Sequence, residues 1–291
     1  MSPPGIADSR LLPDADFREA WNAIFLDAGV RERLVAQGLF SLTARHALPF
    51  ERAPIHGILL LSGPPGTGKT TLARGLANEI ASHLPDVKTR FLQVDPHAFA
   101  SAALGKSQQL VDTLFRQTIP EAAAQEPAIV LLDEVETLAA DRYRMSPETN
   151  PADVHRAVDA ALSGLDLLTR SKADVLLIAT TNFPQAVDEA FRSRADLIVA
   201  MSLPDDAARL AILKDTLDAL AEAHPKIADL KEDVATFVNE SEGLDGRRLR
   251  KAVLAAAASR IEVARDPARM TKADVLEALH RARAAREEGS R

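Results

Sequence analysis

Residues 58–71 read ILLLSGPPGTGKTT, a short apolar run followed by a turn rich in glycine and proline. A helical pattern starts near Lys69, so this stretch predicts a strand, a loop and a helix in that order. From Gly63 to Thr70 it matches the phosphate-binding pattern G-x-x-x-x-G-K-[ST] in full. The alternative is a strand-to-helix turn without a ligand, but the strand-loop-helix context favours a phosphate loop. We therefore expect a nucleotide to bind at Gly63, Pro64, Pro65, Gly66, Thr67, Gly68, Lys69, Thr70 and Thr71.

The residue types in this loop suit phosphate chemistry. The glycines at 63, 66 and 68 allow backbone angles that a side chain would forbid, so successive N–H groups can converge on phosphate oxygens at a helix N-terminus. The Lys69 ammonium would reach the β- and γ-phosphates. The Thr70 hydroxyl would ligate Mg²⁺, so ATP and Mg²⁺ are the expected cofactors.

The composition of the 291 residues narrows the class of protein. Apolar residues make up 46% and aromatic residues 4%, so we expect a core of Leu, Val, Ile and Ala. The formal charge of −7 argues against a protein that coats nucleic acid. The chain has no cysteine, no apolar run long enough to span a bilayer and no signal-peptide pattern at its start. We expect a cytoplasmic protein that does not contact a membrane.

Short apolar runs alternate with helical patterns through the first part of the chain. This alternation predicts an α/β fold with a parallel five-stranded sheet, which binds ligands at the carboxyl ends of its strands. The expected strands are Ile58–Leu61, Arg90–Val94, Ile129–Leu132, Val175–Ala179 and Leu197–Met201. After Pro204 only helical patterns remain, at about residues 205–223, 231–240, 246–264 and 272–286. We predict a flexible tail at residues 1–16, a large α/β domain at 17–203 and a small all-helical domain at 204–291.

Polar side chains follow the third and fourth expected strands. Asp133 and Glu134 come directly after one of them, and Asn182 follows the next. We expect Asp133 to hold the Mg²⁺ shell through Thr70 or water, and Glu134 to orient and partly deprotonate the attacking water. Asn182 could bond the γ-phosphate or this water. As alternatives, the acidic pair could cap the following helix and Asn182 could be a turn residue.

Arginines near the expected site are candidates for contact with the phosphates. Arg192 and Arg194 precede the fifth expected strand, and we expect them close to the sheet end that carries the site. A guanidinium there would stabilise charge on the transferring phosphoryl group, commonly from a neighbouring subunit, and a surface ion pair is the alternative. Arg247 opens a helix of the small domain and could fold back onto the same nucleotide. A zinc hydrolase has no support, because no H-E-x-x-H pattern is present, and a G-x-S-x-G elbow is absent as well.

Several segments together resemble the AAA+ ATPases, namely GPPGTGKT, IVLLDE, ATTN and a Gly-Arg pair in the helical region. Four segments are similar to the pachytene checkpoint family, namely LLDEVETLAADR, NPADVHRAVDAALSGLD, FRSRADLIV and SEGLDGRRLRK. The similarity runs from about Trp21 to about Arg283. The first set of motifs specifies only the superfamily, whereas the SRAD and SEGLDGRRLRK segments carry the finer assignment.

This resemblance implies a P-loop ATPase with a helical lid that forms a homo-hexamer and hydrolyses ATP to ADP and phosphate. Members of the family remodel HORMA-domain proteins, and bacterial relatives are associated with anti-phage signalling. By resemblance, Asn182 is the first sensor, Arg194 the finger donated across the subunit interface and Arg247 the second sensor. The roles in binding and hydrolysis fall on Lys69, Thr70, Asp133 and Glu134. The central-pore loops fall at residues 101–107 and near 142–153.

The sequence departs from the family in two features. Eukaryotic members carry an N-terminal adaptor-binding domain, whereas the residues before Ile58 look like the opening of the ATPase module. We therefore expect direct delivery of the substrate or a separate adaptor. The first pore loop has Ala102 and Ala103 where a Trp or Tyr would grip a threaded chain, although Leu104 or Phe99 could substitute. This departure weakens the inference of threading more than that of ATP hydrolysis.

Three functions stay open on the sequence. An ATP-driven remodeller that opens or disassembles complexes of a HORMA-domain protein agrees best with the motifs. A loader or switch on nucleic acid would need a basic pore with aromatic residues or an added DNA-binding module, and the acidic balance and single Tyr count against it. An unfoldase for another complex would need a pore-loop aromatic and a docking tail, and the sequence shows neither.

Overall fold

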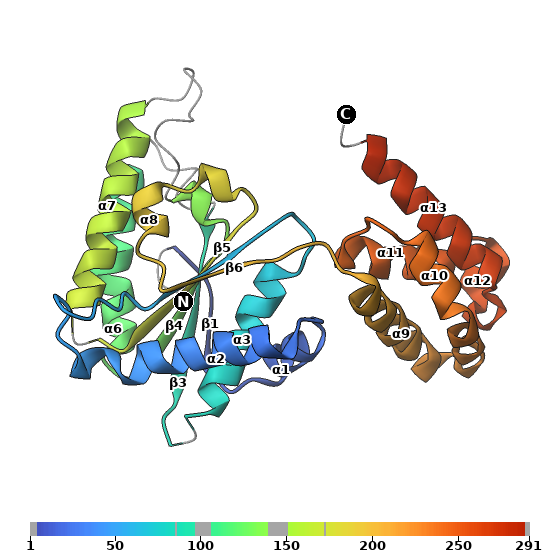
Figure 1. Ribbon diagram of the computed structural model, residues 1–291, viewed down its shortest axis with the longest axis horizontal. Coiled ribbons are helices and arrows are strands. Elements are labelled where there is room, and N and C mark those ends of the chain that lie inside the picture. Colours follow the sequence, from blue (N-terminus) through green and yellow to red (C-terminus); the bar gives the residue numbers. More distant parts are fainter. Residues whose placement is uncertain (1–4, 85, 97–105, 139–150, 172, 289–291) are drawn as a thin grey trace. The chain divides into compact units, whose positions relative to one another are not determined.

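The apolar runs form strands of one sheet in the computed structural model of the chain (Figure 1). The order of the six strands is β1-β3-β4-β5-β2-β6, and β2 to β6 pair in parallel. The predicted α/β class is confirmed, and all five predicted strands are present. Their bounds are β2 Ile58–Ser62, β3 Thr89–Val94, β4 Ala128–Leu132, β5 Val175–Thr181 and β6 Leu197–Ala200.

The structure describes residues 5–84, 86–96, 106–138, 151–171 and 173–288. By their contacts, the residues divide into two units. The first comprises Met1–Gly63 and Lys69–Met201, and the second comprises Pro64–Gly68 and Ser202–Arg291. This division differs from the predicted one at the phosphate loop. Pro64–Gly68 falls within the predicted large domain but groups with the helical unit.

A sixth strand, β1 Ile6–Leu12, corrects the prediction of a flexible tail at residues 1–16. It pairs antiparallel with β3, with Ile6 opposite Val94 and Leu12 opposite Thr89. Ile6 and Leu12 are buried, whereas the residues between them are exposed or half-buried. An edge strand needs few apolar side chains, so the polar composition of this segment resembled that of a tail.

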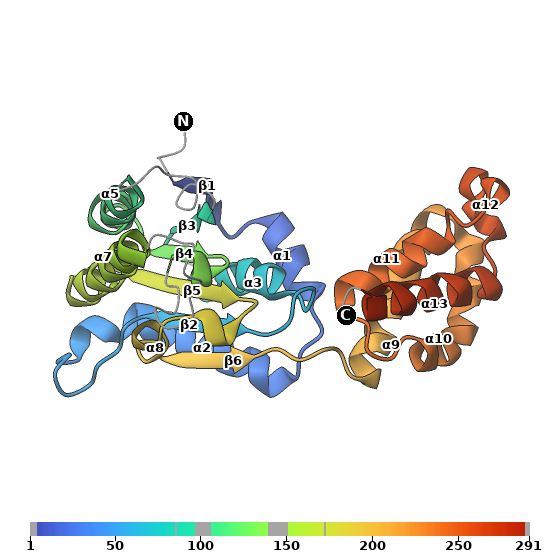
Figure 2. The same cartoon turned by 90° about the horizontal axis from the view of Figure 1, so that it is seen from above.

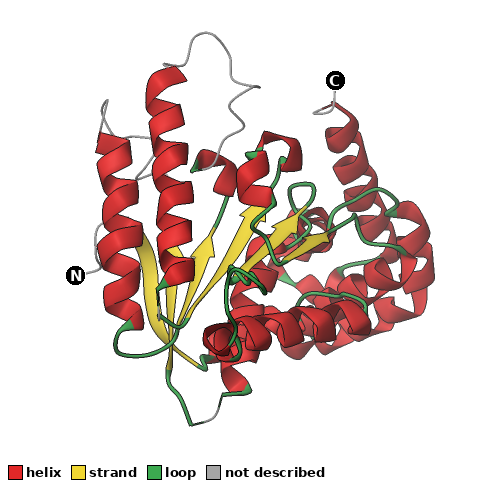
Figure 3. Cartoon of the chain, turned by 60° about the vertical axis from the view of Figure 1, so that its left-hand side comes forward, coloured by secondary structure: helices red, strands yellow, loops and turns green. Residues whose placement is uncertain are grey.

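Helices cover both faces of the sheet in the first unit. Their bounds are α1 Ala15–Asn22, α2 Ala28–Thr43, α3 Lys69–Ser82, α5 Lys106–Thr113, α6 Ile119–Ala123, α7 Pro151–Arg170 and α8 Glu189–Arg192. A π-helical segment occupies Leu114–Thr118, and 3₁₀ turns occupy Arg45–Ala47, Val135–Thr137 and Pro184–Ala186. Figure 2 shows α5 and α7 on one side of the sheet and α1 and α3 on the other, and Figure 3 shows the strands between helices.

Alternate residues of the strands supply the two halves of the core. In β2, Ile58 and Leu60 pack with the cluster that includes α7, whereas Leu59 and Leu61 pack with the cluster that includes α1, α2 and α3. All five residues of β2 and of β4 are buried, which is the pattern of parallel strands covered on both faces. The phosphate loop therefore begins at the carboxyl end of a strand that is packed on both faces.

The second unit is helical in the part that the structure describes. Its elements are α9 Asp206–Ala223, α10 Val234–Glu240, α11 Gly246–Ala256, α12 Ile261–Arg265 and α13 Lys272–Glu288, with 3₁₀ segments at Pro225–Asp233 and Pro267–Arg269. The single helix predicted at 246–264 is wrong, because α11 and α12 are separate. Asp274 stabilises the break by accepting hydrogen bonds from Ser259 Oγ at 2.8 Å and Arg260 Nη2 at 2.9 Å. Among the described helices, none is both long and apolar enough to cross a membrane.

Candidate nucleotide-binding site

Two glycines of the phosphate loop occupy places that exclude a side chain. Gly63 has a φ of 145°, and a Cβ there would overlap the Met201 carbonyl. Gly66 has a φ of 83°, and a Cβ there would overlap the Asp245 carboxylate. Positive φ values turn successive N–H groups toward one point, as in known anion-binding loops. The loop thus has a backbone conformation compatible with phosphate.

Lys69 is the first residue of α3, at the helix end that favours negative charge. Its side chain is buried, and Nζ donates a hydrogen bond to the Gly63 carbonyl oxygen at 2.8 Å. The ammonium is therefore folded over the loop that it follows. From this place it can contact an anion that the loop holds.

Thr70 and Asp133 meet at the carboxyl end of β4. The Thr70 hydroxyl lies 2.9 Å from Asp133 Oδ1 and 3.1 Å from Oδ2. Thr180, in β5, also donates a hydrogen bond to Asp133 Oδ1. A hydroxyl and a carboxylate are hard oxygen donors, and Mg²⁺ binds through one or two such groups and keeps several waters. These two residues fit the predicted Mg²⁺ site.

Glu134 has a left-handed backbone conformation, with φ 52° and ψ 54°. Its backbone N–H donates to the Thr180 hydroxyl at 3.2 Å. The Asn182 side-chain amide donates to Glu134 Oε1 at 3.4 Å. Such a conformation costs about 1–3 kcal/mol for a residue with a side chain, and it persists only where the surroundings impose it. The two neighbouring strand ends thus aim the Glu134 carboxylate at Asn182.

The sequence reasoning missed two residues of this cluster. Thr180 contacts both acids, and Glu136 Oε1 accepts a hydrogen bond from the Asn182 backbone N–H at 3.2 Å. The other carboxylate oxygen of Glu136 is buried and has no hydrogen-bond partner among the described residues. The signal for both was present, since Thr180 lies two residues before Asn182 in the segment ATTN and Glu136 lies two residues after Glu134.

Arg194 lies at the amino end of the sheet, so the expectation that Arg192 and Arg194 would lie near the site-bearing end is wrong. Asp196, two residues after Arg194, accepts hydrogen bonds from the backbone N–H groups of His56, Gly57 and Ile58, at the start of β2. The phosphate loop follows the opposite end of β2, about 15 Å away for a strand of this length. The error arose because β2 and β6 are parallel. The loop that precedes β6 therefore lies at the amino end of the sheet, whereas the phosphate loop that follows β2 lies at the carboxyl end.

Arg247 opens α11 in the second unit, which also contains Pro64–Gly68. Its backbone N–H donates to the Gly66 carbonyl oxygen at 3.4 Å, and its side chain is exposed. Asp245 caps the same helix by accepting from the Arg248 N–H at 2.9 Å. The start of α11 therefore lies against Gly66 within this unit, and the second-sensor role of Arg247 stays a prediction.

Comparisons with known proteins identify the family of the chain. The family model of the ATPase family associated with various cellular activities (AAA) matches residues 59–203. CD-NTase-associated protein 6 of Pseudomonas aeruginosa is 45% identical over 291 residues, covering 99% of this chain and 96% of that protein. The putative pachytene checkpoint protein 2 of Caenorhabditis elegans is 33% identical over 216 residues, 72% of this chain and 50% of that protein. The chain belongs to the pachytene checkpoint group of AAA ATPases.

The fold of this AAA ATPase also occurs in a solved complex. A chain of the E. coli MS115-1 HORMA:CdnC:Trip13 complex matches it with a TM-score of 0.75, over 95% of both chains and at 17% sequence identity. At this identity the likeness shows the fold. Membership of the family makes the chain a nucleotide-binding ATPase. The predicted pore loops at 101–107 and 142–153 lie, apart from residues 106–107 and 151–153, outside the described residues.

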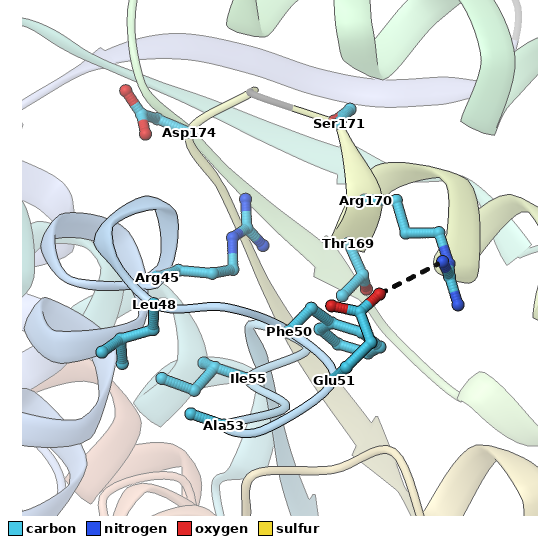
Figure 4. A pocket seen from close by; sticks show the side chains of 10 residues that line it. All are labelled: Arg45, Leu48, Phe50, Glu51, Ala53, Ile55, Thr169, Arg170, Ser171 and Asp174. Carbon is cyan, nitrogen blue, oxygen red and sulfur yellow. Dashed lines mark ion pairs between the residues drawn. The ribbon is translucent and has the colours of Figure 1, made fainter.

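A recess of about 600 Å³ in this AAA ATPase lies by the starts of β2 and β5 (Figure 4). Arg45 lines it and is buried, which lowers the pKa of its guanidinium. The guanidinium donates to the carbonyl oxygens of His56 at 3.3 Å and Val175 at 3.1 Å, and to that of Ala173. Arg45 therefore ties together the segments that lead into two strands, which is a structural role.

Proposed function

We propose that this AAA ATPase hydrolyses ATP to ADP and phosphate with Mg²⁺ and uses the energy to open or disassemble complexes of a HORMA-domain protein. The observation that carries hydrolysis is the hydrogen-bonded cluster of Thr70, Asp133, Glu134 and Asn182 at the carboxyl ends of β4 and β5. Identity of 45% over 99% of the chain to a CD-NTase-associated protein supports a setting in bacterial anti-phage signalling. The shared fold with a chain of a HORMA:CdnC:Trip13 complex supports the partner.

Each residue of the site has a proposed role. Lys69 and the N–H groups of the loop bind the β- and γ-phosphates, and Arg247 contacts them from the helical lid. Thr70 and Asp133 hold Mg²⁺, which neutralises phosphate charge when bound. Glu134 accepts a proton from the attacking water, and Asn182 keeps the Glu134 carboxylate in place.

The position of Arg194 supports an assembly of several copies. Arg194 and the phosphate loop lie at opposite ends of one sheet, so a chain does not supply a finger to its own site. A head-to-tail contact brings the amino end of one sheet to the phosphate loop of the next subunit, and a contact repeated by rotation closes into a ring. We propose the homo-hexamer of the family, with Arg194 acting on the neighbour's nucleotide.

The proposed partner is a protein in the cytoplasm, not a nucleic acid or a membrane. The net charge of −7 opposes a sequence-independent attraction to phosphate backbones. Among the described residues, positive side chains of the lid are often balanced by acids, as in the pairs Arg250–Asp215 and Arg283–Glu240. Both observations favour a protein substrate.

The proposal is tested by steady-state ATP hydrolysis of the full chain alone, with a HORMA-domain protein from the same genome, and with single- or double-stranded DNA. We expect turnover that needs Mg²⁺ and rises with the HORMA-domain protein only. Stimulation by DNA would establish a loader or switch on nucleic acid instead. Stimulation by neither, with a HORMA-domain protein of demonstrated competence, would favour an unfoldase for another complex.

A further inference from the structure

We infer that Asp166 is the positioning residue for Arg194, and that it holds the guanidinium in the orientation needed to reach the nucleotide of a neighbouring subunit. The inference deepens the proposed function and rests on it, because it assumes that Arg194 acts on that nucleotide. It assigns a role to a residue that the sequence analysis quoted only as the last residue of the segment NPADVHRAVDAALSGLD. Asp166 lies in α7, 28 positions before Arg194 in the chain.

The contact between the two side chains is bidentate. Arg194 Nε lies 2.8 Å from Asp166 Oδ1, and Nη2 lies 2.9 Å from Oδ2. Nη1 donates to the Ala190 carbonyl oxygen at 2.7 Å. A two-point contact fixes the plane of the guanidinium as well as its distance, which a single contact does not. The bonds lower the pKa of Asp166 and raise the pKa of Arg194, so both groups stay charged near neutral pH.

Asp166 is a suitable anchor because α7 is fixed to the sheet. Its neighbours Leu165 and Leu168 are almost completely buried in the core, whereas 45% of the Asp166 side chain is exposed. Arg194 instead lies in the short connection between α8 and β6. Asp196 fixes the backbone of that connection at the start of β2, and Asp166 fixes the Arg194 side chain.

The contacts leave the guanidinium able to bind a further anion. Arginine has five N–H groups, and the bonds to Asp166 and Ala190 use three of them. Arg194 and Asp166 also line a recess of about 340 Å³, together with Phe50, His56, Arg170 and Ser193. The held guanidinium is therefore preoriented at an opening, and preoriented charges that stabilise a transition state are usually the largest single contribution to catalysis.

The neighbouring Arg192 provides a matched contrast. Its contact with Glu189 joins residues of the same short helix through Nη1 at 3.4 Å, and both side chains are more exposed. An exposed pair of this kind contributes about 0–1 kcal/mol and leaves the arginine free to move. Substitution of Glu189 thus removes the acidic partner of Arg192 and leaves the ion pair between Arg194 and Asp166 intact.

The test is a double-mutant cycle in the full-length protein, with kcat, KM for ATP and thermal unfolding measured for each variant. We expect Arg194→Ala to lower kcat by about 1000-fold, the low end of the effect of an arginine finger. Asp166→Ala should lower kcat about tenfold with KM and the unfolding temperature unchanged, and Asp166→Asn should fall between it and the wild type. The double variant should match Arg194→Ala, because Asp166 acts only through Arg194. Glu189→Ala should behave as the wild type.

Other results overturn the inference in distinguishable ways. Wild-type or higher kcat for Asp166→Ala, together with an inactive Arg194→Ala, would reject the positioning role and leave the finger intact. A double variant less active than Arg194→Ala would show that Asp166 acts by another route. Wild-type activity of Arg194→Ala would reject the proposed finger itself, and with it the inference.

Discussion

The Glu134 backbone is the most constrained part of the site. Among the described residues, Glu134 is the only non-glycine residue with a positive φ, and Thr180 and Asn182 bond its main chain and side chain. The residues at the ends of β4 and β5 maintain this strained backbone conformation without a bound nucleotide. Glu134 therefore has the same backbone conformation before a nucleotide arrives, which suits the role in proton transfer that we propose.

We expect Glu134→Gln to bind ATP as the wild type does and to lower kcat by about 100-fold or more, because the amide keeps the shape of the side chain but does not accept a proton. Nucleotide affinity by calorimetry and steady-state turnover measure the two effects. Glu126→Gln is the matched control, since Glu126 precedes β4 and bonds Arg90 at 3.0 Å at the far end of the same strand. Turnover near the wild-type rate in Glu134→Gln would remove Glu134 from the mechanism.

At the scale of the elements, the Asp274 carboxylate joins the start of α13 to the residues that precede α12. Thr271 and Asp274 form a reciprocal cap at the start of α13, with Thr271 N–H donating to Asp274 Oδ2 at 2.9 Å and Asp274 N–H to Thr271 Oγ1 at 3.4 Å. Ser259 and Arg260 donate to the same carboxylate. Burial raises the pKa of Asp274, but these hydrogen bonds outweigh burial and bring the pKa to about 2.

Asp274→Ala should destabilise the helical unit by about 2 kcal/mol, because it removes a helix cap together with the hydrogen bonds that the buried carboxylate accepts from Ser259 and Arg260. The carboxylate is favoured in the folded state, so its contribution is complete above the ordinary pKa of 3.8 and is lost as pH falls through about 2. Hydrogen exchange of α13 at pH 7 and between pH 4 and 2 measures both effects. The control is Asp266→Asn, which alters an exposed pair with Arg269. Equal protection of α13 in both variants would reject this account.

The elements that could be predicted from the sequence are those with a strong local pattern of residues. Buried parallel strands and the phosphate loop have strong local patterns, so β2 to β6 and the loop could be located from residue order alone. Strand β1 could not, because only Ile6 and Leu12 of this edge strand are buried, and the residues between them form no apolar pattern. Contacts between residues distant in sequence, such as Asp166 with Arg194 and Thr180 with Asp133, could not be predicted, because the segments that contain Asp166 and Thr180 do not show which side chains meet.

At the scale of the whole molecule, the proposed action of Arg194 on a neighbouring subunit would make activity a property of adjacent copies. We expect Arg194→Ala and Glu134→Gln subunits to be inactive separately and partly active when mixed. In an equimolar mixture about one interface in four combines an intact Glu134 with an intact Arg194, so turnover should approach a quarter of the wild-type rate. Turnover in assemblies verified as mixed by mass tags provides the measurement.

The control for this mixture pairs Glu134→Gln with a chain that carries both substitutions, because no complete interface can then form. Recovery in the control would indicate exchange with active protein. Absence of recovery in verified mixed assemblies would show that Arg194 does not act across an interface.

The most direct measurement follows the conformation of a HORMA-domain protein from the same genome while the wild-type chain or Glu134→Gln hydrolyses ATP. The account predicts that the partner changes state only with the wild type and ATP, and that turnover rises at the same time. If a competent partner changes neither its own state nor the rate of ATP hydrolysis, the chain is an ATPase with another substrate, and the proposed remodelling function is contradicted.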